Sequence, residues 1–511
     1  MGTVPYNVNR GTVRIKVANV GFHKTREYIQ LYDFPAIQSQ VYYNPCSCNE
    51  LTSLDKRHIL DRISNFQPGN EHFQQLRRNL LDMARMVKTE SYTGKVSFSE
   101  VMKETRKKQR GRYTRAFENL RDNRILVNSK LAILNSFIKF EKWDLEKVEK
   151  GKPARSIQFR SYEYLYLCKA YMLPIVKALK ETDVVVHGQQ LRNVFTKNFD
   201  NPGIAAVLRE SWDSLKDPVA ICLDHSKFDG HYDIDLLKIE HEHYQVFNNC
   251  RFFKYLLSLQ LHNNGVTANG IRYKCEGIRA SGEYTTSEGN GRLNYCMIKT
   301  YLDSLGIDDY RIHVNGDDSV VMVERKHALK VSDNVGYFNN FNMETEIEMV
   351  ADHFPQITFC QASPLRVNDG NGGIMWKMVK TPVRAMSRMA FAERRYIEIS
   401  DRYMAGVGLC ELACSMGIPV LQAHCVRVLS WVTHSRPLGS IEKAPAQDAL
   451  VGELSILPVL METREDFELA FGISIPEQIE FENLSGAYQN TPEYSRVKLF
   501  ISKHKKFITK E

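Results

Sequence analysis

The chain has 511 residues, 43% of them hydrophobic and 25% charged, with a formal net charge of +8. These proportions are typical of a soluble globular protein. One compact core rarely exceeds roughly 250–300 residues, so we expect two or three subdomains. The mild excess of positive charge suits a polyanionic partner without proving one.

The longest stretch of low polarity, residues 404–432, is interrupted by Glu411, His424 and Arg427. A membrane-spanning helix tolerates such side chains badly, so we predict buried helices there and no transmembrane segment. The eleven cysteines are scattered without paired CxxC spacing. We therefore expect reduced structural thiols, as in a cytosolic protein, rather than a metal site.

Residues 98–150 are strongly charged and have a helical pattern. Within them, the basic run KETRKKQRGRYTRAFENLR at 103–121 interleaves Tyr113 and Phe117 at helical spacing. Most basic runs of this kind are solvated helix faces. The interleaved aromatic residues also fit a wall along a nucleic-acid path. On the second interpretation, the contacting residues are Arg106, Lys107, Lys108, Arg110 and Arg112.

The pattern changes from residue 216 onward. KDPVAICLD at 216–224 is a short buried run, which predicts a strand with Asp224 at its C-terminal end. A glycine-rich polar segment covers 263–291, and a hairpin and a further strand follow at 313–320 and 356–362. Apolar periodicity predicts helices at 233–247, 292–306 and 326–341 and in most of the C-terminal region. A β-containing centre is therefore flanked by helical regions.

Within HVNGDDSV at 313–320, Asp317 and Asp318 are adjacent on a tight turn, although neighbouring carboxylates repel each other. A divalent cation between them would remove this repulsion. Mg²⁺ takes few protein ligands, prefers carboxylates and completes its shell with water and phosphate oxygens. Two such ions about 3.5–4 Å apart support phosphoryl transfer, and Asp224 is placed to supply a carboxylate from a second strand.

Several segments carry a more specific resemblance. LDHSKFDGH at 223–231, ASGEYTTSEGNGRLN at 280–294 and VNGDDSVV at 314–321 resemble motifs A, B and C of viral RNA-dependent RNA polymerases. FIKFEK (137–142) together with KPARSIQFRSYEY (152–164) resembles motif F, and FCQASP (359–364) resembles motif E. RKKQRGRYTRAFENL (106–120) resembles the basic segment of the fingers. The spellings are most similar to the tombusvirus family and its plus-strand RNA relatives.

This resemblance implies roles for individual residues. Asp224 and Asp317 would bind two Mg²⁺ ions, for which Mn²⁺ can substitute, and Asp318 would be an adjacent, weaker ligand. Positioning and charge neutralisation would then carry catalysis without a protein nucleophile. Ser281 and Gly282 would form a flexible loop against the template.

Other implied roles concern the nucleotide sugar. Asp229 and Asn290 would hydrogen-bond the ribose hydroxyls, and Thr286 would lie on the ribose side. For Asp229, the cap of a helix at 230–247 is an alternative role. Gly289 would permit a close approach of the backbone to nucleic acid.

Basic residues in the motif F region would line the nucleotide tunnel and bind the triphosphate: Arg155, Arg160 and Lys152, with Lys139 and Lys142 upstream. Arginine suits this role because its planar fork binds phosphate oxygens in pairs. For the two upstream lysines, ordinary surface charge is an alternative. Glu344 stands where the family usually has a motif D lysine, so we assign no general acid; Lys326, Lys330 or a water could serve.

The resemblance also implies an α+β, right-hand polymerase whose antiparallel-sheet palm carries the GDD hairpin. Residues 1–215 would form the fingers and the N-terminal fingertip region. Residues 216–362 would form the palm, with a fingers insertion around 248–280, and residues 363–511 a mainly helical thumb. Family members favour de novo initiation, for which the loop at 434–447 is a candidate support.

The implied function is RNA-templated RNA synthesis in viral genome replication and transcription, with template RNA, product RNA and ribonucleoside triphosphates as partners. A reverse transcriptase shares the palm carboxylates, and an inactive RNA-binding scaffold is a third hypothesis. Membrane anchoring in this family belongs to an N-terminal domain that we expect the chain to lack. We therefore expect a membrane-anchoring viral replication protein as a partner, and a location in the host cytoplasm at membrane-associated replication complexes.

Overall fold

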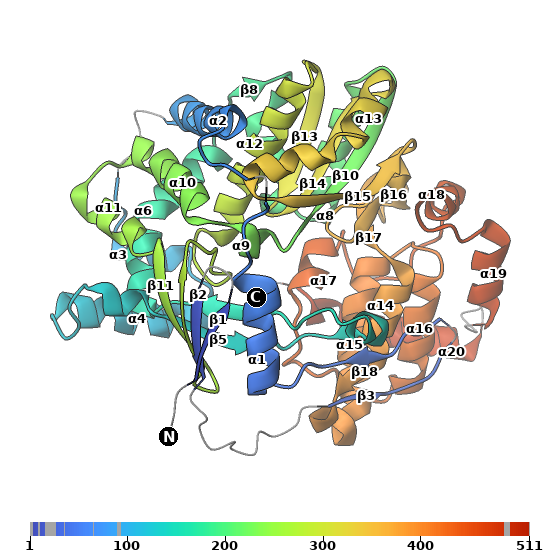
Figure 1. The fold of residues 1–511 in the computed structure, drawn as a ribbon. Helices are drawn as coiled ribbons and strands as arrows, with labels where there is room; N and C mark the ends of the chain where they lie inside the picture. The colour runs from blue at the N-terminus through green and yellow to red at the C-terminus, as the bar shows by residue number, and fades with distance from the viewer. Residues whose placement is uncertain are drawn as a thin grey trace.

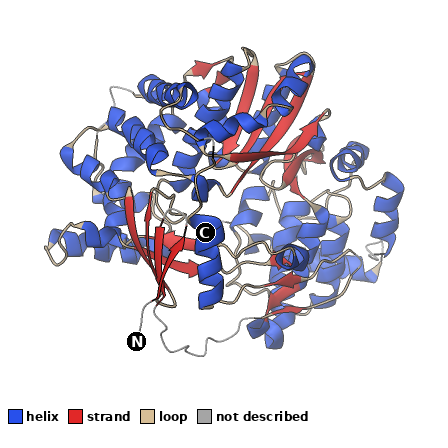
Figure 2. Ribbon diagram, in the orientation of Figure 1, coloured by secondary structure: helices blue, strands red, loops and turns tan. Residues whose placement is uncertain are grey.

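The computed structural model describes residues 4–8, 11–15, 27–34, 36–64, 66–88, 94–484 and 491–509, and for the first two ranges the backbone alone. Helices and strands are mixed along the chain. Two larger sheets lie apart from each other, and helices surround both (Figures 1 and 2).

The central sheet has four antiparallel strands in the order β13-β14-β10-β15. Their bounds are Tyr310–Asn315 for β13, Asp318–Glu324 for β14, Pro218–Ser226 for β10 and Glu344–Ala351 for β15. The strand expected at 216–224 agrees with β10. The pairing of β10 with β15 shifts its register between Cys222 and Leu223, which is a β-bulge.

Helices cover both faces of this sheet, which explains the nearly continuous apolar run in β10. Alternate residues of a strand point to opposite faces. Val219, Ile221 and Leu223 are buried in a core that includes α12 (Thr286–Ser304), whereas Ala220 and Cys222 are buried in another with α8 (Asn201–Asp213). A run buried on both sides has no polar alternation.

The second sheet has six strands in the order β1-β2-β12-β11-β5-β7, and β11 and β5 are parallel. Their bounds are Val4–Val8, Gly11–Ile15, Arg272–Glu276, His262–Thr267, Leu134–Ile138 and Ser156–Phe159, in that order. The segment expected to be polar and glycine-rich therefore contributes the β11–β12 hairpin.

Short sheets join distant parts of the chain. β3 (Tyr28–Gln30) pairs with β18 (Phe391–Glu393), and β4 (Gln40–Val41) pairs with β6 (Trp143–Asp144). The remaining pairs are β8 with β9 (Val185–Val186, Gln189–Gln190) and β16 with β17 (Ala362–Asn368, Ile374–Lys380). The N-terminal segment thus contacts the C-terminal helical region (Figure 1).

The C-terminal region is mainly helical, as expected, and has its own core. Its central pair is α15 (Ser400–Ser415) and α16 (Leu421–Val432), which occupy the low-polarity stretch. Its other helices are α14 (Pro382–Ala390), α17 (Ala444–Ala449), α18 (Met461–Phe471), α19 (Ile475–Leu484) and α20 (Pro492–Lys503). None of the helices in the described part of the chain has the length and apolar character that crossing a membrane requires.

Further helices fill the N-terminal and central regions: α1 (Ser47–Ser53), α2 (Glu71–Val87), α3 (Phe98–Lys103), α4 (Lys107–Arg121), α5 (Leu145–Glu149), α6 (Tyr162–Lys180), α7 (Leu191–Val194), α9 (Phe228–His231), α10 (Ile234–Phe247), α11 (Arg251–Ser258) and α13 (Arg325–Ser332). The helix expected at 292–306 begins earlier, at Thr286. The helix expected at 326–341 is two elements, α13 and a 3₁₀ helix at Val335–Phe341.

Two expectations were wrong. The strand expected at 356–362 is absent there, because a 3₁₀ helix occupies Phe354–Gln356 and β16 begins only at Ala362. Cys360 and Gln361 have positive φ angles of 53° and 62°, which a regular strand excludes. Cys46 and Cys48 are joined as a disulfide, whereas the other cysteines are free thiols as expected.

Candidate active site

The two adjacent aspartates lie on the turn between β13 and β14. Asn315 pairs with Asp318, so Gly316 and Asp317 are the central residues of a two-residue turn. Gly316 has a φ of 72°, which glycine adopts without strain. Asn294 Nδ2 on α12 donates to the carbonyl oxygens of Gly316 and Asp317, at 3.2 and 2.9 Å. The turn is thereby fixed to the helix behind it.

A histidine connects this helix to the neighbouring strand. His225 follows Asp224 on β10, is buried, and lies 2.9 Å through Nε2 from Asn294 Oδ1. Its Nδ1 lies 2.8 Å from the Thr345 hydroxyl on β15. Burial lowers the pKa of His225 to about 4, so the ring is neutral near pH 7. The strands β10 and β15, the β13–β14 turn and α12 are therefore held in one hydrogen-bonded arrangement.

Three carboxylates meet at this point of the sheet. Asp224 and Asp317 are exposed, and Asp318 is half-buried. Desolvation by the surrounding protein raises the pKa of Asp318 to about 7, and Asp317 and Asp224 contribute to this rise. Desolvation also raises the pKa of Asp317, helped by Asp224 and opposed by Arg155 and Arg57. The negative charges thus repel one another across two strands.

The donor set fits a hard divalent cation. Within the described part of the chain, none of Asp224, Asp317 and Asp318 forms an ion pair. No cluster of three or more His, Cys, Asp or Glu side chains among the described residues is close enough to hold a metal on its own. Mg²⁺ needs few protein ligands beside water and phosphate, so the carboxylate oxygens present here suit it without such a cluster.

Asp229 and Asn290 lie beside these carboxylates and contact each other. Asn290 Nδ2 donates to Asp229 Oδ1 at 2.7 Å. Burial raises the pKa of Asp229 to about 6, with a contribution from Asp317. The alternative role of Asp229 as a helix cap was wrong, because Asp233 caps α10 by accepting from the amides of Asp235 and Leu236.

The role expected for Gly289 was also wrong. A Cβ at Gly289 would collide with Glu240 Oε1, the Tyr244 hydroxyl and Arg279 Nη2, which are all buried protein atoms. Glycine is therefore required here by a buried polar network and not by an approach of nucleic acid. The sequence carried no signal of this network, because its members are far apart in the chain.

The loop before α12 is held against β7. The Ser281 hydroxyl accepts from the amide of Gln158 at 3.2 Å, and the Gly282 amide donates to the Gln158 carbonyl at 2.7 Å. A Cβ at Gly282 would lie 2.6 Å from that carbonyl oxygen, so only glycine fits. Thr286 donates to the carbonyl of Ala280 at 2.7 Å. Contacts of these residues with template or ribose stay predictions.

Among the basic residues of the motif F region, Arg155 and Lys152 are exposed. Arg155 lowers the pKa of both Asp229 and Asp317, so it lies near the carboxylates, and its Nε is 3.7 Å from Glu141. Arg57, which the sequence did not reveal, also lowers the pKa of Asp317. It precedes the site by more than 160 residues, and only the fold brings it there.

Two residues of this region do not fit the predicted tunnel. Arg160 is fully buried, and its guanidinium donates to Glu283, to the carbonyl of Ala132 and to Asn263 Oδ1. A triphosphate could reach it only if these bonds broke, so the nucleotide-binding role predicted for Arg160 is not supported. Lys142 donates to main-chain carbonyls of Arg388 and Phe391.

A further carboxylate near the site has no recognisable motif. Glu348 on β15 contributes to the raised pKa of Asp318. The pKa of Glu348 is itself raised, mainly by desolvation and further by Asp224. The β-bulge between β10 and β15 places Glu348 in this position, and bulges leave no clear trace in a sequence. Glu344, at the expected lysine position, is the first residue of β15, opposite Ser226 of β10, and its carboxylate lies 3.8 Å from His231 Nε2.

The predicted nucleic-acid surface is the first half of α4 with the residue before it. All five of its basic residues are exposed: Arg106, Lys107, Lys108, Arg110 and Arg112. The first turn of α4 contains no acidic residue, and no side chain caps its start. Cations at a helix N-terminus are unfavourable, because that end of the helix dipole is positive. This surface therefore concentrates positive charge at a local cost in stability.

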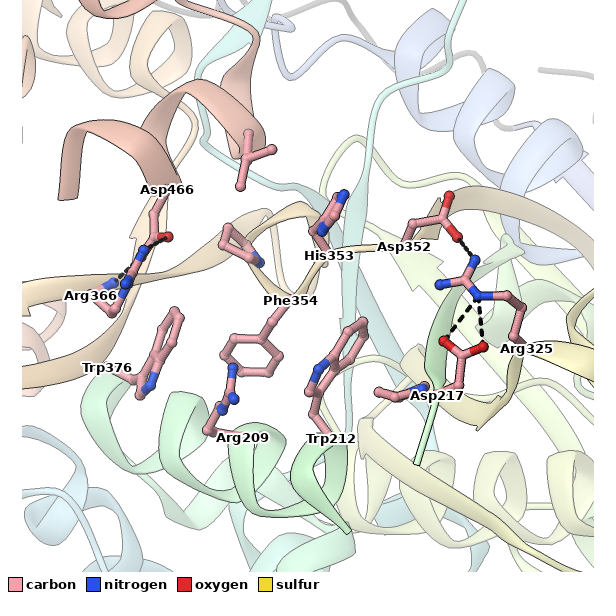
Figure 3. A pocket seen from close by; sticks show the side chains of 13 residues that line it. Arg209, Trp212, Asp217, Arg325, Asp352, His353, Phe354, Arg366, Trp376 and Asp466 are labelled. Atoms are coloured by element: carbon pink, nitrogen blue, oxygen red, sulfur yellow. Dashed lines mark hydrogen bonds and ion pairs between the residues drawn. The ribbon is translucent and has the colours of Figure 1, made fainter. Parts of the chain in front are cut away.

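A cavity of about 590 Å³ lies at the other end of β10 (Figure 3). The rings of Phe354 and Trp376 meet edge to face, and the guanidinium carbon of Arg209 lies beside both, at 5.1 and 5.2 Å from their centres. Arg325 forms ion pairs with Asp217 and Asp352, and Arg366 with Asp466, all of which line the cavity. Asp224 lies six positions after Pro218, which lines the cavity, and this spacing is about 20 Å along β10, so the cavity is distinct from the candidate active site.

Comparison with known proteins defines the class. The family described as "Viral RNA dependent RNA polymerase" matches residues 15–489 of the chain. This match covers most of the chain, so the protein belongs to that family.

Individual relatives point the same way. The chain is similar to the RNA-directed RNA polymerases of Cymbidium ringspot virus (31% identical), Tomato bushy stunt virus strain Cherry (30%) and Melon necrotic spot virus (32%). The first two alignments cover 73% of this chain and 45% of the relative, and the third covers 68% and 44%. The expected relationship to plus-strand RNA virus polymerases is confirmed. The chain spans less than half the length of these relatives.

Proposed function

We propose that the chain catalyses RNA-templated RNA synthesis for viral genome replication and transcription. A 3′-hydroxyl of RNA attacks the α-phosphate of a ribonucleoside triphosphate, and pyrophosphate leaves. The observation that carries this proposal is the convergence of Asp224, Asp317 and Asp318 from two paired strands, with raised pKa values at the last two and no ion pair in the described part of the chain. Family membership supports the same reaction.

The proposed architecture is a right hand. Residues 216–362 form the palm, and its support is the antiparallel sheet with the β13–β14 hairpin. The insertion at 248–280 belongs to the fingers, since β11 and β12 pair within the six-stranded sheet. Residues 1–215 form the rest of the fingers with the fingertip region, and residues 363–511 the thumb, which is supported by a separate helical core.

In the proposed site, Asp224 and Asp317 hold two Mg²⁺ or Mn²⁺ ions, with Asp318 adjacent. Bound ions would supply charge neutralisation at the phosphates and activation of the attacking hydroxyl. Arg155 and Arg57 bind the triphosphate electrostatically, because both face the carboxylates that a nucleotide must approach. Lys152, on the exposed surface beside Arg155, adds charge at the tunnel entrance.

Asp229 and Asn290 recognise the ribose in this proposal. The carboxylate can only accept hydrogen bonds, and the amide can both donate and accept, so together they match a hydroxyl group. A deoxynucleotide would leave this bonded pair without the hydrogen bonds to the 2′-hydroxyl, at a cost of about 1–3 kcal/mol for each bond lost. The remaining nucleotide and template contacts in this proposal come from Ser281, Gly282 and Thr286. To make them, the loop would have to give up hydrogen bonds that it now forms within the protein.

Template and product RNA bind along α4 in this proposal. Arg106, Lys107 and Lys108 are exposed cations without ion pairs in the described part of the chain, at a helix end that already repels them. RNA phosphates would remove that repulsion. We further propose a membrane-anchoring viral replication protein as a partner, and a location in the host cytoplasm at membrane-associated complexes, both on family resemblance alone.

The test is extension of a primed RNA template by the purified chain. We expect Mg²⁺-dependent incorporation of GTP opposite template cytosine, abolished by a chelator, with a kcat/KM for GTP at least tenfold above that for 2′-deoxy-GTP. Preference for 2′-deoxy-GTP would instead identify a reverse transcriptase. RNA binding without any metal-dependent synthesis would identify an inactive scaffold.

A further inference from the structure

A buried chain of polar side chains runs from α10 to the proposed ribose-binding pair. Glu240 accepts from Arg279 Nη2, and Arg279 Nε donates to Asn290 Oδ1 at 3.0 Å. Asn290 Nδ2 then donates to Asp229 Oδ1 at 2.7 Å. Glu240, Arg279 and Asn290 are 1%, 1% and 4% exposed, so bulk water does not compete for these bonds.

This arrangement allows only one orientation of the Asn290 amide. A guanidinium has donors and no acceptor, whereas an ionised carboxylate has acceptors and no donor. The amide oxygen must therefore face Arg279, and the amide nitrogen must face Asp229. A flipped amide would place donor against donor and acceptor against acceptor. The second N–H of Asn290 lies at the same end of the amide as Asp229, where it can donate to a sugar hydroxyl.

Arg279 is itself held from several directions. Its guanidinium carbon lies 4.2 Å from the centre of the Tyr232 ring, and its Nη2 donates to the Tyr232 hydroxyl at 2.6 Å. Tyr232 and Tyr244 donate to the two oxygens of Glu240. Burial alone would raise the pKa of Glu240, but Arg279 and these hydroxyls keep it below the ordinary value. Both members of the ion pair therefore stay charged near neutral pH.

Stability alone does not explain this placement. A buried ion pair contributes little net stability compared with apolar side chains of the same volume. Other buried arginines serve as comparisons: Arg160 bonds Glu283, and Arg292 lies 2.8 Å through Nη1 from His243 Nε2. None of their bonds in the described part of the chain reaches Asp229 or Asn290. Arg279 differs from them by its bond to a residue of the proposed sugar site.

We propose that Arg279, held by Glu240, is a positioning residue that sets the preference for ribonucleotides by fixing the amide orientation of Asn290. This inference rests on the proposed polymerase function and deepens it. Arg279 need not touch the substrate. With the amide fixed, a 2′-hydroxyl that enters the site meets an N–H donor and a carboxylate acceptor together. Without Arg279 the Asn290 amide can flip. Its oxygen then faces the 2′-hydroxyl for part of the time and repels the hydroxyl oxygen.

The test is Arg279→Lys, which keeps the positive charge beside Glu240 but removes the Nε–H that Asn290 accepts. Single-nucleotide incorporation opposite template cytosine is measured with GTP and with 2′-deoxy-GTP. We expect the ratio of their kcat/KM values to fall about tenfold, mainly through a higher KM for GTP, with 2′-deoxy-GTP little changed. Arg279→Lys/Asn290→Ala should have the same ratio as Asn290→Ala alone, because both changes act through one group.

Arg292→Lys is the matched control. It places the same substitution at a fully buried arginine of α12, two residues after Asn290, and we expect its GTP preference to match the wild type. Because Arg279→Lys can impair folding, Glu240→Gln is a second variant. It keeps a hydrogen-bonding side chain between the tyrosines but removes the charge that holds Arg279, and we expect a smaller fall in the ratio, about threefold.

The outcomes are separable. A wild-type chain without templated synthesis overturns the proposed function and this inference with it. A wild-type chain that prefers GTP, with folded Arg279→Lys and Glu240→Gln variants of unchanged ratio, overturns only the inference. An equal fall in the ratio for Arg292→Lys also overturns it, because a general loosening of α12 would then be the cause.

Discussion

The two ends of β10 carry opposite arrangements of charge within one sheet. At the N-terminal end, Asp217 pairs with Arg325, with 3.0 Å between Nε and Oδ1, and other charges around the adjacent cavity are also paired (Figure 3). At the C-terminal end, Asp224 faces Asp317 and Asp318, and their mutual repulsion raises pKa values that desolvation has already raised.

This difference distinguishes charged side chains that pair within the protein from charged side chains that we propose bind a ligand. Exposed ion pairs like that of Asp217 each contribute about 0–1 kcal/mol and are complete within the protein. The carboxylates at the other end lower stability unless a cation arrives from outside. One strand therefore serves the fold at its start and the proposed reaction near its end.

The largest expected effect comes from removing one charge at each end. Asp317→Asn keeps the shape of the side chain and removes a carboxylate from the repelling group. We expect elongation on a primed template to fall by about a thousandfold or more, with an unchanged or slightly higher Tm, because a repulsion is removed. Asp217→Asn should keep elongation within about twofold of wild type and lower stability by at most about 1 kcal/mol.

Either of these two variants can contradict the proposed difference between the two ends of β10. Near-normal synthesis by Asp317→Asn would remove the carboxylate from the proposed metal site. A large loss of synthesis in a folded Asp217→Asn variant would mean that the paired end also takes part in the reaction.

An intermediate effect, on RNA binding, is expected from changes in α4. The exposed cations at its start, like the carboxylates near Asp224, form no ion pair within the described part of the chain, and we propose that they bind a ligand. Replacing Arg106, Lys107 and Lys108 by alanine should weaken RNA binding and flatten its dependence on salt. The slope of log K against log salt should fall by about 0.7 for each phosphate of single-stranded RNA that the variant no longer neutralises. Fluorescence anisotropy with labelled single-stranded RNA at several salt concentrations measures this slope.

The matched control replaces three exposed cations of α20 by alanine: Arg496, Lys498 and Lys503. Equal slopes for both variants would make α4 an ordinary solvated face.

The smallest effect is a pH dependence of stability without metal. The pKa of Asp318 is about 7 in the folded chain, above the ordinary value of 3.8. Between these values the folded state holds a proton on Asp318 that the unfolded state has released, so the contribution of Asp318 to stability falls as the pH rises from about 4 to 7 and then levels. Buried histidines such as His225, whose pKa is lowered to about 4, add the opposite slope, so the measurement is the wild-type Tm minus the Tm of Asp318→Asn at each pH. This difference should fall from about pH 4 to 7, whereas the corresponding difference for Asp217→Asn should not change. A difference that stays constant or grows over this range would contradict the repulsion.

Much of the central region could be predicted from local sequence. The apolar run before Asp224 predicted β10, because a strand covered on both faces needs no polar alternation. The strand at 356–362 failed because Cys360 and Gln361 adopt positive φ angles, which neither residue type signals. Local pattern is informative only where propensity and packing agree.

The site shows the same limit. The adjacent aspartates, Asp229 and Asn290 carry recognisable motifs, so sequence could locate them. Arg57, Glu348 and Arg279 carry none, since a distant segment, a β-bulge and a buried bond bring them into place. Arg160 looked like a triphosphate ligand because sequence shows its charge and not its burial.

Helix α12 has a consequence for the timing of the proposed reaction. Asn290 bonds Asp229 near the start of the helix, and Asn294, one turn later, bonds the carbonyls of Gly316 and Asp317. Four helical residues span about 6 Å, and their separation is fixed by main-chain hydrogen bonds. In the proposed reaction, a displacement of Asn290 by the sugar would therefore also move the turn that carries the aspartates. If Asn290 contacts the sugar as proposed, one helix links that contact to the position of the aspartates, and we expect a wrong sugar to lower kcat as well as to raise KM.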